Sequence, residues 1–139
     1  MTLQPTASAQ ASTARPGATQ AAQAMAAVRL GIGAVGLLAP GRLAWRLFLP
    51  GRPIDEATTL VLRGAAARDL ALGLGAALAS QRGPGPVRGW LLAAALVDCC
   101  DALTVASSKS ASPAVRAGTA LVGGLSASAH VLVARQLTR

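Results

Sequence analysis

Two stretches decide the fold: ALGLGAALA at residues 71–79 and LLAAALV at residues 91–97. A helix of a soluble bundle carries a polar face opposite its core, and neither stretch has one. The composition agrees, since 53% of the 139 residues are hydrophobic and the mean hydropathy is +0.49. The low content of β-branched residues and the abundance of Ala and Leu favour helix over strand. These stretches therefore predict helices that lie in a membrane.

The chain contains four apolar segments, each about as long as the roughly 20 residues that a helix needs to cross a bilayer. Pro40-Gly41 ends the first segment, Gly83–Pro86 separates the second from the third, and Pro113 opens the fourth as a first-turn proline. Residues 1–20 are rich in Ala, Ser, Thr and Gln, which predicts a disordered tail. The expected fold is all-α, a four-helix transmembrane bundle with helices at about 21–39, 58–80, 87–107 and 113–135.

The aromatic residues agree with four passes. Trp45 and Phe48 fall in the first connection and Trp90 at the start of the third segment, as expected for side chains at the headgroup level. Gly41–Gly51 mixes arginines with apolar residues, which predicts a short amphipathic piece lying in one interface. Five basic residues flank each face, so the positive-inside rule leaves the orientation open.

The net charge of +8 does not indicate nucleic-acid binding. The basic residues are scattered singly between apolar runs, and a chain with no Tyr and one Phe offers no surface for base stacking. Arg outnumbers Lys twelve to one in a chain rich in Ala and Gly, which is typical of a GC-rich bacterial genome. We expect a multi-pass protein of the bacterial inner membrane, with the lipid bilayer as its partner.

Charged residues inside the apolar segments mark the candidate site, because an ion at bilayer depth costs about 2.5–3.5 kcal/mol or more unless it is paired or hydrated. Arg68 and Asp101 lie equally far from the turn at Pro84-Gly85, so we expect them to form the core ion pair between the second and third segments. If the first two segments form a hairpin about the middle of their connection, near Phe48-Leu49, Arg29 lies at the same depth in the membrane as Arg68. The expected polar cluster, neutral in sum, consists of Arg29, Arg63, Arg68, Asp69, Asp98 and Asp101.

Three interpretations of this cluster stay open. It can be a purely structural network of ion pairs, a hydrated pocket that handles a small-molecule ligand or protons, or the centre of an intramembrane enzyme with Asp98 or Asp101 as general base. We favour a binding or accessory role over an enzyme. No metal site is expected, because two arginines at the same depth would oppose a metal cation. No cofactor is expected either. Self-association into a homo-oligomer stays open.

Several other residues are assigned to packing. Eight glycines in the segments are expected to let helices approach closely: Gly31, Gly33, Gly36, Gly73, Gly75, Gly118, Gly123 and Gly124. The adjacent Cys99 and Cys100 are expected to pack between helices as small apolar side chains. His130, the only histidine, is expected at a helix contact or at the interface rather than as a ligand.

One family shares this pattern. Arg63-Gly-x-x-x-Arg68-Asp69-Leu-x-Leu-Gly73, followed by Trp90 and by Asp98-x-x-Asp101-Ala102, resembles the small bacterial and fungal membrane proteins of domain-of-unknown-function family four-two-six-seven. The resemblance covers about residues 28–137. It implies a four-pass membrane protein and assigns no activity.

Overall fold

The computed structural model describes residues 15–47 and 54–137, and every element of regular structure within them is an α-helix. The all-α class is therefore confirmed. Four long helices correspond to the predicted segments, and a fifth, short helix lies in the first connection, where an amphipathic piece was expected. The helices are α1 (Pro16–Leu38), α2 (Pro40–Leu47), α3 (Glu56–Ser80), α4 (Pro84–Ser107) and α5 (Pro113–Gln136).

Three of the four long helices, α1, α3 and α4, begin earlier than the sequence patterns predicted. Pro16–Gln20 belongs to α1, so the prediction of a tail is wrong for these residues, and residues 1–14 lie outside the described part. Likewise α4 begins at Pro84 and not near residue 87, because proline fits the first turn of a helix. Gly83 precedes it with φ +105°, a backbone conformation that favours glycine and lets the chain reverse there.

Side-chain caps define the starts of two helices. The Asp55 carboxylate accepts a hydrogen bond from the Thr58 backbone N–H at 2.7 Å, and the Ser112 hydroxyl accepts one from Val115 at 3.3 Å. The hydrogen bonds from Thr58 hold the pKa of the Asp55 carboxyl below its ordinary value. These caps fix where α3 and α5 leave their connections.

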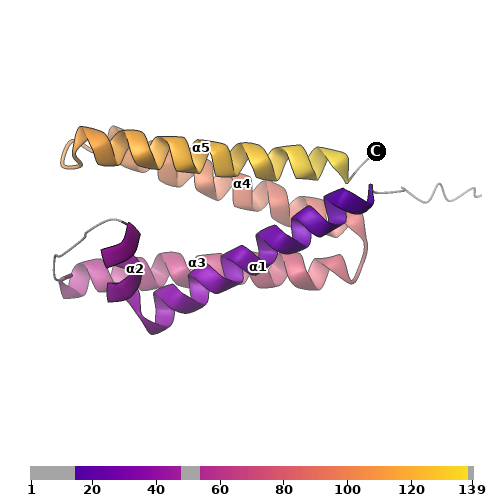
Figure 1. Cartoon of the computed structure of the whole chain (residues 1–139), viewed down its shortest axis with the longest axis horizontal. Coiled ribbons are helices and arrows are strands. Elements are labelled where there is room, and N and C mark those ends of the chain that lie inside the picture. Colours follow the sequence, from indigo (N-terminus) through magenta and orange to yellow (C-terminus); the bar gives the residue numbers. More distant parts are fainter. Residues whose placement is uncertain (1–14, 48–53, 138–139) are drawn as a thin grey trace, which may run out of the picture.

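The long helices form two close pairs, α1 with α3 and α4 with α5, joined by the α3–α4 hairpin (Figure 1). At the end that holds the start of α1 and the end of α5, all four helices share an apolar core. Away from that end α1 diverges from α5 and crosses α3 toward α2 (Figure 1). The buried core consists of Ala18, Ala22, Ala79, Val87, Leu91, Ala134 and Leu137.

Five of the eight glycines lie at helix contacts. A Cβ at Gly33 would come within 2.7 Å of the Ala66 carbonyl oxygen, and one at Gly73 within 2.9 Å of the Ala26 carbonyl oxygen, so α1 and α3 touch backbone to backbone. Gly36 also lies at this contact, Gly75 faces the Trp90 ring and Gly123 faces Ala102. The expectation is not met at three positions where a Cβ would meet nothing within 4 Å: Gly31, Gly118 and Gly124.

The close contact between α1 and α3 at Gly33 predicts how a larger residue there changes the stability of the protein. We expect Gly33→Ala to destabilise the protein by about 1–3 kcal/mol, because the added methyl group forces α1 away from α3. The matched control is Gly31→Ala, half a turn away on the open face, which should be neutral or stabilising by up to about 1 kcal/mol. Unfolding of both full-length variants in mixed micelles measures the difference. Equal stability of the two would contradict the backbone contact.

Three helices are long and apolar enough to cross a membrane: α1, α4 and α5. The long helix α3 is not among them, because every 18-residue stretch of it contains Arg63, Arg68 and Asp69. Large apolar side chains such as Leu96, Leu103, Leu121 and Leu125 point outward from α4 and α5, as expected of surfaces in contact with lipid. The chain thus has the character of a helical membrane protein.

Candidate functional site: an arginine held by three helices

Arg29 of α1 lies at the centre of the polar residues, with only 8% of its surface exposed. Its Nη1 donates to Asp69 Oδ1 of α3 at 2.6 Å, and its Nη2 donates to both oxygens of Asp98 of α4 at 2.6 Å. The planar guanidinium suits this arrangement, because its N–H groups diverge in one plane toward separate acceptors. Arg29 therefore connects α1 to both α3 and α4 by hydrogen-bonded ion pairs.

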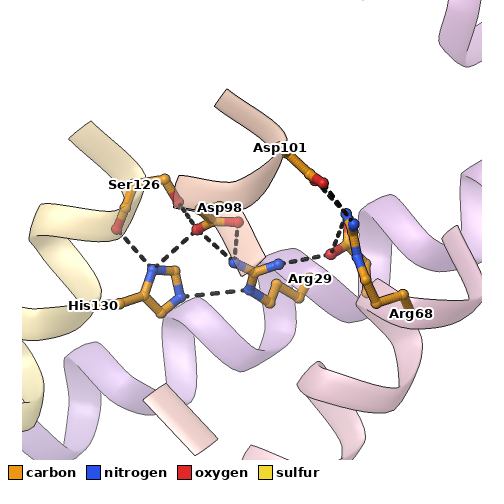
Figure 2. A network of polar contacts seen from close by, with 7 residues as sticks. Arg29, Arg68, Asp98, Asp101, Ser126 and His130 are labelled. Carbon is orange, nitrogen blue, oxygen red and sulfur yellow. Dashed lines mark hydrogen bonds and ion pairs between the residues drawn. The ribbon is translucent and has the colours of Figure 1, made fainter. Parts of the chain in front are cut away.

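The fourth long helix reaches the same arginine through His130, which is 5% exposed. Arg29 Nε donates to His130 Nε2 at 3.5 Å, and His130 Nδ1 lies 2.8 Å from the Ser126 carbonyl oxygen (Figure 2). Since Arg Nε can only donate, this contact requires a lone pair on Nε2, and in that tautomer the neutral imidazole donates its Nδ1–H to the Ser126 carbonyl oxygen. His130 Nδ1 also lies 3.6 Å from Asp98 Oδ2 (Figure 2). The Ser126 hydroxyl in turn donates to Asp98 Oδ2 at 2.7 Å.

The sequence pattern predicts His130 at a helix contact or at the interface, and it predicts no role for Ser126. Both are in the site. A usable signal was present, since Gly123, Ser126 and His130 are spaced by three and four residues and hence share one face of α5. The Gly123 backbone approaches Asp98, where a Cβ would come within 3.0 Å of the Asp98 carbonyl oxygen.

Arg68 and Asp101 form the second part of the cluster. The two Arg68 Nη atoms donate to the two Asp101 oxygens at 2.9 and 2.7 Å, and this confirms the pair expected from their spacing around the α3–α4 turn. Arg68 Nη2 also lies 3.9 Å from Asp69 Oδ1, which links this pair to Arg29. The expectation that it forms the core is wrong, because the Asp101 side chain is 49% exposed and Arg29 is the buried arginine.

Arg63 is not brought into the cluster. It lies on α3 nearer the α2 end, is exposed, and forms no ion pair with the other described residues. Cys99 and Cys100 are also exposed rather than packed between helices. Within residues 15–47 and 54–137, no group of three or more His, Cys, Asp or Glu side chains is arranged to hold a metal ion.

A cavity of about 380 Å³ lies beside Arg29, where α1 and α5 diverge. Its polar floor comes from all four long helices and consists of Arg29, Asp69, Asp98, Ser126 and His130. Its walls are apolar and belong to α1 and α5, and three of these side chains, Val28, Ile32 and Val122, are also exposed to the surroundings of the bundle. The site is therefore a pocket with a charged floor and an apolar mouth.

Comparison of this chain with protein-family models, with curated proteins and with solved structures finds no match.

Proposed function

We propose that this chain is a four-pass membrane protein that holds a small ligand in the cavity between α1 and α5. The observation that carries the proposal is the convergence of Arg29, Asp69, Asp98, Ser126 and His130 on one cavity. Ligand pockets in proteins have this character, with mostly apolar walls and a few polar groups that fix orientation. Charged residues inside a membrane bundle also occur mainly where they face its interior or a water-filled cavity.

The four-pass arrangement requires that α3 cross the bilayer with its charges. Its pairing supports this, because Asp69 bonds to Arg29 and Arg68 bonds to Asp101 on the neighbouring helices. With 25 residues α3 is also long enough. The resemblance to family four-two-six-seven and a location in the bacterial inner membrane are part of the same proposal.

The other interpretations fit the geometry less well. A purely structural network needs no cavity, yet two of its carboxylates and its central arginine line one. An enzyme with Asp98 or Asp101 as general base needs that carboxylate free to take a proton, whereas both Asp98 oxygens accept hydrogen bonds from Arg29, and one of them also from Ser126. Asp101 is bound at both oxygens by Arg68 and does not line the cavity.

Thiol labelling tests whether the cavity is open to water, as a ligand pocket must be. In a background with Cys99→Ala and Cys100→Ala, we expect Ser126→Cys to react with a small water-soluble methanethiosulfonate, because the thiolate forms only where water reaches the sulfur. The full chain in lipid nanodiscs is used, and the extent of reaction is read by mass spectrometry.

The matched control is Leu125→Cys, one residue away on the outer surface of α5, where the native side chain is 63% exposed. At this site lipid covers the sulfur, so it should stay unmodified. If Ser126→Cys is as inert as Leu125→Cys, the cavity is closed to water and the pocket proposal is wrong.

A further inference from the structure

The charges of the cluster do not balance. Because Arg63 lies outside it and His130 is neutral, two guanidinium groups face three carboxylates and one negative charge is left over. Each carboxylate has a guanidinium partner, but the sum is negative, and a net charge is disfavoured inside a membrane bundle, so the pocket favours a ligand that brings one positive charge. This imbalance indicates the charge of the ligand that the pocket binds.

Asp69 pairs with Arg29 through Oδ1, which also lies 3.9 Å from Arg68 Nη2, but it is the carboxylate with an oxygen to spare. Asp98 accepts hydrogen bonds from Arg29 and Ser126, and Asp101 accepts one at each oxygen. Asp69 accepts one hydrogen bond, from Arg29 to Oδ1, and its Oδ2 accepts none from any other described residue. Asp69 also lines the cavity, and its second oxygen is an acceptor that the described residues leave without a hydrogen bond.

Arg29 does not make the pocket an anion site. Each of its three side-chain nitrogens already donates to the protein, namely to Asp69, to Asp98 and to His130. These hydrogen bonds leave at most one N–H of Nη1 for a further partner, and an anion there would meet the surplus negative charge of the carboxylates. A cation avoids this repulsion and gains the attraction of the Asp69 carboxylate.

The apolar walls of the cavity indicate what the uncharged part of the ligand is like. Met25, Val28 and Ile32 of α1 and Val122 of α5 surround the way to the floor, so an apolar body of moderate size fits beside them. Resting on the proposed pocket function, we infer that the α1–α5 cavity binds an amphiphilic organic cation with a single positive charge, held at its charged end by Asp69.

Calorimetry with three ligands of nearly one shape tests this inference on the full chain in nanodiscs of zwitterionic lipid. The ligands are benzyltrimethylammonium, its neutral isostere neopentylbenzene and the anion benzenesulfonate. We expect the cation to bind at least about tenfold more tightly than either of the others, because only it pairs with the Asp69 carboxylate.

The variant Asp69→Asn should lower the affinity for benzyltrimethylammonium by at least about tenfold, because it removes the surplus charge. The protein should stay folded, since the amide keeps an oxygen for Arg29 and leaves two guanidinium groups with two carboxylates. Asp55→Asn makes the same chemical change at the start of α3, where Asn caps a helix equally well, and should leave binding unchanged.

The outcomes separate this inference from the proposed function. Binding of the neutral or anionic ligand as tightly as the cation, or cation binding that Asp69→Asn does not weaken, overturns the choice of a cation. Absence of binding by all three also overturns it. In each case the reactivity of Ser126→Cys decides independently whether the cavity is a hydrated pocket.

Discussion

Arg29→Leu should cause the largest loss of stability of any single substitution in the cluster. It leaves Asp69 and Asp98 buried without the cation that pairs with both, and breaking a buried ion pair from one side commonly costs about 3–5 kcal/mol. Reversible unfolding by sodium dodecyl sulfate in mixed micelles, followed by tryptophan fluorescence, measures the change in the free energy of unfolding.

Two controls make this result specific. The same substitution at the exposed Arg88, near the start of α4, should change the free energy of unfolding by no more than about 0.5 kcal/mol. The triple variant Arg29→Leu with Asp69→Leu and Asp98→Leu should recover much of the loss, because apolar replacement of a whole buried network is often nearly neutral. If Arg29→Leu unfolds like Arg88→Leu, Arg29 is not the centre of the cluster.

The depth of the charged residues could be predicted from the sequence because the rise of a helix is constant. Counting from the turn at Pro84 pairs Arg68 with Asp101, and counting from the first connection brings Arg29 to the same level. Both expectations used only positions along the chain. The same reasoning gave the four long helices from the lengths of the apolar segments.

The rotation and tilt of the helices could not be predicted in this way. They are set by close contacts such as Gly33 against Ala66 and Gly73 against Ala26, whose partners cannot be read from one sequence. As a result, the sequence alone does not predict that Arg29 rather than Arg68 is buried, nor that the divergence of α1 from α5 opens a cavity at His130.

The position of the charged cluster depends on the membrane topology, because the cluster lies in the bilayer only if α3 crosses it. If all four long helices cross, Arg42 in α2 and Lys109 between α4 and α5 lie on one side of the membrane and Arg82 between α3 and α4 on the other. If only the three most apolar helices cross, Arg42 and Arg82 share a side and Lys109 lies opposite.

One-sided labelling distinguishes these two arrangements directly. Single cysteines Arg42→Cys, Arg82→Cys and Lys109→Cys are placed in the full chain with Cys99→Ala and Cys100→Ala, and sealed vesicles are treated with a membrane-impermeant maleimide. A permeant maleimide first establishes that all three sites react. We expect Arg42→Cys and Lys109→Cys to behave alike and Arg82→Cys to behave oppositely. Shared labelling of Arg42→Cys and Arg82→Cys, with Lys109→Cys opposite, would contradict a membrane-spanning α3 and with it the intramembrane pocket.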